Sequence, residues 1–122
     1  RRCGWIDLTA LRYACMINGV TKLVMTKADV LDAFKQLSVC TAYKINGKES
    51  SEIPFQMTRV KIEPVYREFN GWNISTSAAK SPAELPQAMK GYVEFINKEL
   101  GVRIQYISNG PGREQIIALF DK

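Results

Sequence analysis

Two short segments of the 122-residue chain carry groups that could hold a ligand. In the first, Thr-Lys-Ala-Asp at residues 26–29, Lys27 and Asp29 lie two residues apart, directly after the apolar run Leu-Val-Met. An aspartate carboxylate can accept two parallel hydrogen bonds, from the ring N–H and from the exocyclic amine of a guanine base. The lysine stem can lie along the base, with its ammonium near the ribose. This spacing therefore suits a loop that reads guanine.

The same segment has a simpler interpretation as the start of a helix. Asp29 directly precedes a short helix predicted at residues 30–35. Aspartate is a common N-cap because its side-chain oxygen accepts a hydrogen bond from a backbone N–H in the first turn. Lys27 would then be a solvated surface residue. The two roles are compatible, and the segment alone does not choose between them.

The second segment is Ser-Asn-Gly-Pro-Gly-Arg at residues 108–113. Glycine and proline form a tight turn whose backbone N–H groups can donate to a carbonyl oxygen such as O6 of a purine, although a plain strand-to-strand turn has the same composition. The two segments complement each other, because a carboxylate accepts from the donor edge of guanine while amides donate to its acceptor. Both follow predicted strands, and ligands bind at the carboxyl ends of strands in open α/β sheets.

Periodicity and turn residues predict the elements that position these segments. The predicted order is a helix at residues 5–18, a strand at 21–25, a short helix at 30–35, strands at 38–45, 48–55 and 62–69, a helix at 81–100, and strands at 102–107 and 115–120. Asp7 is the expected N-cap of the first helix, and Asn18-Gly19 its C-terminal stop. Asn46-Gly47 predicts a hairpin turn, because both central positions of a type I′ turn need positive φ.

The same periodicity predicts which faces are buried. The stripe on the first helix comprises Leu8, Leu11, Cys15 and Asn18, widened by Ala14 and Ile17. The strand at 38–45 alternates, with Val39, Thr41, Tyr43 and Ile45 on one face and Ser38, Cys40, Ala42 and Lys44 on the other, and one of the two faces is expected to be wet. The long helix carries Leu85, Met89, Tyr92, Ile96 and Leu100 on one face. Ser81 and Glu84 form a capping box with proline at the first helical position, and Pro86 could move the start of the helix later.

The chain is therefore predicted to be mixed α/β, with a parallel part near residues 26–29 and an antiparallel β-meander beside it, flanked by helices. The strand order stays open. The length suits a single domain, residues 1–122. The opening Arg-Arg-Cys, without an initiator methionine, leads us to expect a piece of a longer polypeptide.

Composition argues against several classes of function. The net charge of +5 is spread along the chain without a block of like charges, which disfavours nucleic acid as a partner. The apolar runs fall short of the roughly 18 residues of a membrane helix, and we expect no signal peptide. The chain has no histidine, and Cys3, Cys15 and Cys40 lack metal-site spacing, so we expect reduced thiols in a cytosolic protein and not a zinc site.

Catalytic motifs are equally scarce. There is no Gly-x-Ser-x-Gly segment, no paired-cysteine motif and no glycine-rich phosphate loop ending in Gly-Lys-Ser/Thr. Gly47-Lys48 is followed by a glutamate inside the predicted hairpin. A nucleotide hydrolase complete in itself is therefore not expected.

Several motifs along the chain together resemble a known family. They are Arg-Arg-Cys-Gly-Trp-Ile-Asp-Leu at residues 1–8, Thr-Lys-Ala-Asp-Val-Leu-Asp at 26–32, Val-Cys-Thr-Ala-Tyr-Lys at 39–44, Glu-Pro-Val-Tyr at 63–66, Gly-Trp at 71–72 and Ser-Asn-Gly-Pro-Gly-Arg at 108–113. They resemble segments of the adenylosuccinate synthetase family, including its guanine-binding Thr-Lys-x-Asp-Val-Leu-Asp and its late Ser-x-Gly-Pro-Asp-Arg turn. The chain departs from the family at Ala28, commonly leucine, and at Gly112, usually aspartate.

The resemblance implies a function for the parent enzyme. The family is cytoplasmic, homodimeric and Mg²⁺-dependent, belongs to purine biosynthesis and joins IMP and L-aspartate into adenylosuccinate while GTP becomes GDP and phosphate. Its mechanism passes through 6-phosphoryl-IMP. The resemblance also implies that the parallel strands belong to a P-loop-NTPase-like sheet, and that neither nucleic acid nor membrane is a partner.

The resemblance also assigns residues. The implied GTP contacts are Arg1, Lys27, Ala28, Asp29, Ser108, Asn109 and Gly110. The family's phosphate loop, catalytic aspartate and histidine, IMP contacts and Mg²⁺ ligands precede the position of Arg1. The chain is thus expected to be the C-terminal, guanine-binding portion, without catalytic residues and inactive alone. The alternative is a stand-alone α/β interaction domain that binds no nucleotide.

Overall fold

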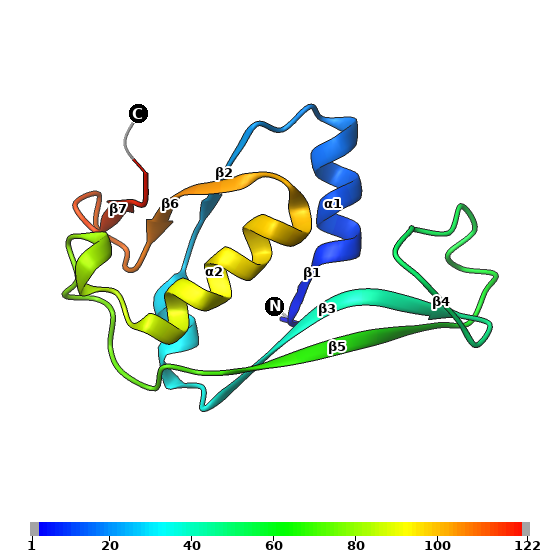
Figure 1. The fold of residues 1–122 in the computed structure, drawn as a ribbon, viewed down its shortest axis with the longest axis horizontal. Helices are drawn as coiled ribbons and strands as arrows, with labels where there is room; N and C mark the ends of the chain where they lie inside the picture. Colours follow the sequence, from blue (N-terminus) through cyan, green and yellow to red (C-terminus); the bar gives the residue numbers. More distant parts are fainter. Residues whose placement is uncertain (1–2, 121–122) are drawn as a thin grey trace.

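The computed structural model describes residues 3–120, and they form a mixed α/β fold with two sheets, as predicted (Figure 1). The elements, in order, are β1 (Ile6–Asp7), α1 (Leu8–Ile17), β2 (Lys22–Met25), the 3₁₀ helix η1 (Ala28–Ala33), β3 (Gln36–Ile45), β4 (Lys48–Ser50), β5 (Ile62–Asn70), the 3₁₀ helix η2 (Pro82–Glu84), α2 (Gln87–Leu100), β6 (Arg103–Ser108) and β7 (Ile116–Ala118).

The smaller sheet contains the predicted parallel part. Its strand order is β2–β6–β7, with β2 parallel to β6 and β7 antiparallel to β6. The connection from β2 to β6 runs through β3, β4, β5 and α2, so these parallel neighbours are far apart in sequence. This sheet carries both candidate segments.

The larger sheet is built around β3. On one edge, β5 pairs antiparallel with β3 along its full length, and on the other edge β1 pairs parallel and β4 antiparallel. Asn46 and Gly47 both have positive φ, which confirms the hairpin turn. The strand predicted at residues 48–55 is wrong beyond Ser50, because the chain leaves the ladder there and the Ser51 carbonyl accepts a hydrogen bond from Arg12.

A β-bulge interrupts the alternation predicted for β3. Cys40 pairs with Tyr66 and Ala42 with Val65, so Thr41 is the extra residue on its strand. The bulge changes which face each following side chain occupies, and Cys40, Ala42 and Tyr43 are all buried. The predicted single face of alternate residues is therefore wrong, because the register of β5 on β3 could not be known in advance.

Helix α1 begins at Leu8 and not at residue 5, because β1 pairs with β3. Asp7 is its N-cap, as predicted, and accepts a hydrogen bond from the Ala10 N–H at 3.0 Å. Asn18 is the C-cap and Gly19 follows with a φ of 59°. Ile17 is 60% exposed, so the predicted buried stripe does not extend to it.

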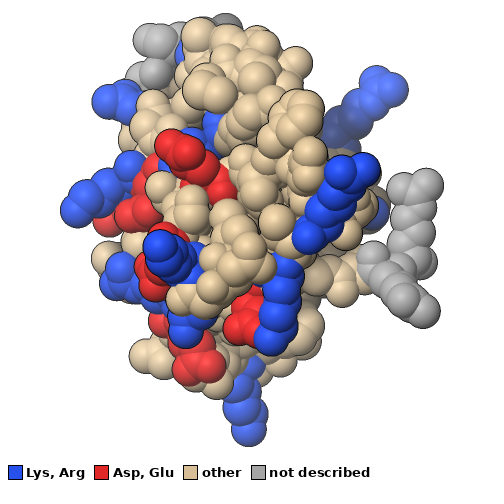
Figure 2. All heavy atoms as spheres, turned by 90° about the vertical axis from the view of Figure 1, so that its right-hand side faces the viewer, with Lys and Arg blue, Asp and Glu red and all other residues tan. Residues whose placement is uncertain are grey.

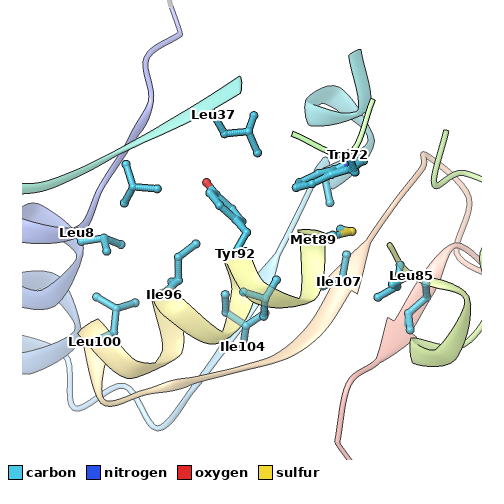
Figure 3. Close-up of a cluster of buried hydrophobic side chains, with 14 residues drawn as sticks. Leu8, Leu37, Trp72, Leu85, Met89, Tyr92, Ile96, Leu100, Ile104 and Ile107 are labelled. Atoms are coloured by element: carbon cyan, nitrogen blue, oxygen red, sulfur yellow. The ribbon is translucent and has the colours of Figure 1, made fainter. Parts of the chain in front are cut away.

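Helix α2 lies between the two sheets, and its apolar face forms the centre of the core (Figures 1 and 3). Every residue predicted for this face is buried: Met89, Tyr92, Ile96 and Leu100 lie on α2, and Leu85 lies just before it, at the C-cap of η2. The capping box of Ser81 and Glu84 is present, but it caps only η2. Pro86 disfavours a helical conformation at the residue before it, so α2 begins directly after the proline, at Gln87, and not at residue 81.

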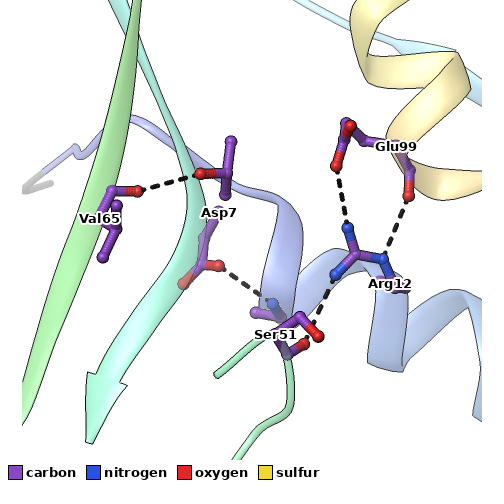
Figure 4. A network of polar contacts seen from close by, with 7 residues as sticks. Asp7, Arg12, Ser51, Val65 and Glu99 are labelled. Carbon is purple, nitrogen blue, oxygen red and sulfur yellow. Dashed lines mark hydrogen bonds and ion pairs between the residues drawn. The ribbon is translucent and has the colours of Figure 1, made fainter. Parts of the chain in front are cut away.

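Arg12 joins the two α-helices (Figure 4). Its Nε donates to the backbone carbonyl of Glu99 at 3.1 Å, and an Nη lies 3.4 Å from the Glu99 carboxylate. A cation near the last carbonyls of α2 interacts favourably with the helix dipole. The contact holds α1 against the C-terminal end of α2.

Tyr92 makes stability depend on pH. Burial raises its pKa from 10.0 to about 12. Since the unfolded chain then loses the proton first, the free energy of unfolding should fall as the pH rises from about 10 to about 12. Urea unfolding at pH 9 and at pH 11 measures how much the free energy of unfolding falls between them. In Tyr92→Phe this fall should be about 1 kcal/mol smaller than in the parent chain. An identical loss in both proteins would contradict this origin.

Candidate functional site

The parallel pairing of β2 with β6 brings the two candidate segments together. Met25, the last residue of β2, pairs with Ile107, next to the end of β6. Residues 26–29 and 108–113 therefore leave the same edge of the sheet from adjacent strands, and β6 also contacts η1. The shared edge is the carboxyl end of the parallel strands, where ligands bind in open α/β sheets.

In the first segment, Lys27 and not Asp29 occupies the N-cap position of η1. Lys27 has a left-handed conformation, with a φ of 56° and a ψ of 38°. Such a conformation costs a non-glycine residue about 1–2 kcal/mol and often occurs at functional sites. Ala28 beside it is buried, and the Lys27 side chain is exposed.

Asp29 consequently keeps its carboxylate available. It lies in the first turn of η1 and is half-buried. Within residues 3–120 its carboxylate accepts no hydrogen bond and forms no ion pair, so the capping role is not what the structure shows. A half-buried carboxylate without a partner at a sheet edge can accept two donors from a ligand.

In the second segment, most backbone amides are already used within the turn. The Asn109 N–H donates to the Gln115 carbonyl at 3.1 Å, and the Gly112 N–H donates to Gln115 Oε1 at 2.9 Å. The Ser108 hydroxyl donates to the Gly110 carbonyl at 3.1 Å. The Gly110 N–H has no acceptor in the described part of the chain. It is thus the donor within residues 108–110 that a ligand carbonyl could use.

The side chain of Asn109 points away from solvent, into the segment at residues 73–80. It is fully buried, and its Nδ2 donates to the carbonyls of Thr76 and Ala79. The same segment is held from the other side by Asp32, at the end of η1. Sequence reasoning missed Asp32 and Thr76. The only local signal was a polar side chain in the motif at residues 26–32, and their pairing spans 44 positions.

The remaining chemistry-bearing groups of the described residues do not form a second site. Burial raises the pKa of the Cys40 thiol, which keeps it protonated and unreactive. Burial, followed by the hydrogen bond donated to Asp7 at 2.5 Å, also raises the pKa of Tyr43. No three Cys, Asp or Glu side chains gather as metal ligands within residues 3–120. Arg1 lies outside the described residues.

The surface has no strong electrostatic polarity on the face toward β4. Lys and Arg side chains are interspersed there with Asp and Glu (Figure 2). No helix in the described part of the chain is long and apolar enough to cross a membrane.

Comparison with known proteins gives one consistent result. The family model described as adenylosuccinate synthetase matches residues 1–117. The adenylosuccinate synthetases of Flavobacterium psychrophilum and Porphyromonas gingivalis are 50% and 51% identical over 117 residues, which cover 96% of this chain and 28% and 27% of the relatives. The fully ligated adenylosuccinate synthetase structure from Plasmodium falciparum is 32% identical with a TM-score of 0.91, over 98% of this chain and 30% of that one. The chain thus spans a little over a quarter of the length of these relatives.

Proposed function

The chain belongs to the adenylosuccinate synthetase family, and we propose that it is the C-terminal, guanine-reading domain of such an enzyme. The whole enzyme would join IMP and L-aspartate into adenylosuccinate while GTP becomes GDP and phosphate, as a cytoplasmic homodimer. The observation that carries the proposal is the parallel pairing of Met25 with Ile107, which brings residues 26–29 and 108–110 to one sheet edge.

Each group has a distinct role in the proposed pocket. The Asp29 carboxylate accepts from N1–H and the 2-amine of guanine, and the Gly110 N–H donates to O6. The Lys27 stem lies along the base, and Ser108 shapes the turn through its bond to the Gly110 carbonyl. Adenine has no N1–H, and its 6-amine would face the Gly110 N–H donor to donor. A site that leaves buried polar groups unpaired rejects the wrong ligand strongly.

Phosphoryl transfer would use residues outside this chain. Mg²⁺, when bound, neutralises charge on the transferred phosphoryl group. The acidic residues of the described chain do not gather as its ligands, so we assign it no residue here. The isolated chain should therefore make no adenylosuccinate, and its contribution is the choice of nucleotide. Arg1 would add a contact from the GTP side of the site.

The proposal is tested first on the chain by itself. In ¹⁵N-labelled protein, millimolar GTP should shift the amide resonances of residues 27–29 and 108–110, and ATP should leave them unchanged. Affinity should be weak, because the groups that bind phosphate are supplied elsewhere. Sub-micromolar affinity by calorimetry would contradict that division of the site. Equal shifts with GTP and ATP would overturn the selectivity for guanine, and no shift with either would favour the stand-alone interaction domain.

The complete enzyme provides the second test. The 117 residues that match the Flavobacterium psychrophilum relative, at 50% identity, can replace the corresponding segment of that enzyme. We call this protein the chimeric synthetase. It should form adenylosuccinate with GTP and not with ATP, whereas the 122-residue chain should form none. A chimera that folds but uses ATP as readily as GTP would overturn the guanine role.

A further inference from the structure

We propose that Thr76 joins the two guanine-reading loops into one rigid unit, with Asp32 and Asn109 as positioning residues. This inference rests on the function proposed above and adds a role for a segment, residues 73–80, to which that function assigns none. Thr76 and Asn109 are buried and Asp32 is half-buried, and their connection joins three parts of the chain that are far apart in sequence through side-chain and backbone groups.

The first half of the connection is the Asp32 carboxylate. It accepts hydrogen bonds from the Thr76 N–H at 2.6 Å, from the Thr76 hydroxyl at 3.0 Å and from Trp72 Nε1 at 2.6 Å. Hydrogen bonds to an ionised carboxylate are about twice as strong as neutral ones. Asp32 and Asp29 both belong to η1, three residues apart, so holding Asp32 also orients the turn that carries Asp29.

The second half is the Asn109 side chain. Its Nδ2 donates to the Thr76 carbonyl and, at 3.1 Å, to the Ala79 carbonyl. Asn109 lies between Ser108 and Gly110, so its side chain anchors the centre of the second loop. A third contact supports the same turn, because Gln115 Nε2 donates to the Ser77 carbonyl at 3.1 Å.

Thr76 is the residue that both halves share. Its N–H and hydroxyl bind Asp32, and its carbonyl binds Asn109, while the residue is only 2% exposed. A base read by a carboxylate from one loop and an amide from another requires a fixed separation between them, within about 0.5 Å. β2 and β6 fix where the loops begin, and Thr76 fixes how they lie beyond the strand ends.

The test is Thr76→Val in the chimeric synthetase. Valine keeps the backbone bonds and the shape of threonine but removes the hydroxyl that binds Asp32. The KM for GTP should rise about 10-fold while the KM for IMP and kcat stay within about 2-fold, since the loss of one charge-assisted hydrogen bond affects the guanine contacts alone. Thr76→Ser, which retains the hydroxyl, should restore the KM for GTP. Ser75→Ala, at an exposed neighbour, is the matched control and should change nothing.

The outcomes separate this inference from the proposed function. If Asp29→Asn raises the KM for GTP and Thr76→Val does not, the connection has no positioning role and the guanine site stands. If neither variant changes it, the guanine site itself is wrong.

Hydrogen exchange on the 122-residue chain covers the case in which the Thr76→Val chimera folds poorly. The hydrogen-bonded amides of the two loops, Val30 in the first and Asn109 and Gly112 in the second, should all lose protection in Thr76→Val, with α2 unchanged. Loss in one loop only, or in neither, would overturn the coupling.

Discussion

Asp29→Asn in the chimeric synthetase should raise the KM for GTP about 30- to 150-fold and leave the KM for IMP nearly unchanged. The substitution turns one of two acceptor oxygens into a donor, which then faces a donor on guanine. Losing a bidentate, charge-assisted contact costs about 2–3 kcal/mol, which corresponds to that range of affinity. Steady-state kinetics with GTP and IMP varied separately measures both constants.

A matched control separates recognition from general electrostatics. Glu114 is exposed and belongs to the turn that follows β6, so Glu114→Gln removes a negative charge near the same edge of the sheet. It should leave both constants within about 2-fold, as expected of a surface substitution. A GTP constant unchanged in Asp29→Asn, or an equal rise in the IMP constant, would remove Asp29 from the guanine pocket.

Met89→Ala should lower the free energy of unfolding of the 122-residue chain by about 2–5 kcal/mol. The Met89 side chain is fully buried, on the face of α2 between Trp72 and Ile107 (Figure 3). The expected loss combines the transfer free energy of the removed atoms with the cost of the cavity they leave. The cavity persists because the two sheets can relax only partly around it. Urea unfolding followed by circular dichroism measures it, with an unchanged m-value as the sign that both proteins unfold alike.

Met16→Ala is the control for this substitution. Met16 on α1 is 69% exposed, so folding removes little of its side chain from water. Alanine also has a higher helix propensity than methionine. The free energy of unfolding should stay within about 0.5 kcal/mol of the parent chain. Equal losses at the two positions would mean that α2 does not organise the core as described.

Features encoded within a few residues of each other were predictable. The Asn46-Gly47 turn, the Asp7 cap and the capping box of Ser81 and Glu84 depend on φ preferences and on hydrogen bonds across three or four positions. The buried face of α2 followed from its period. A fold class and the strands that carry both candidate segments could therefore be derived before the structure.

Long-range pairings were not predictable in the same way. β5 pairs with β3 and not with β4, the strand before it in the chain. The bulge at Thr41 follows from the register of the pairing between β5 and β3. Strand choice depends on the packing of whole faces, which no local pattern encodes. For the same reason the role of Thr76 was not predicted. In the sequence it is a small polar residue of a Ser/Thr-rich loop, and its contacts with Asp32 and Asn109 arise only in the folded chain.

The candidate site shows the division most clearly. The order of residues sets which groups are present: a lysine and an aspartate after one strand and a glycine-proline turn after another. Which of these groups remain available to a ligand depends on contacts made in the folded chain. Lys27 takes the cap position, so the Asp29 carboxylate has no partner among residues 3–120, and Gln115 occupies the turn amides except the Gly110 N–H. The physical reason is that a polar group is available to a ligand only when no other part of the folded chain satisfies it.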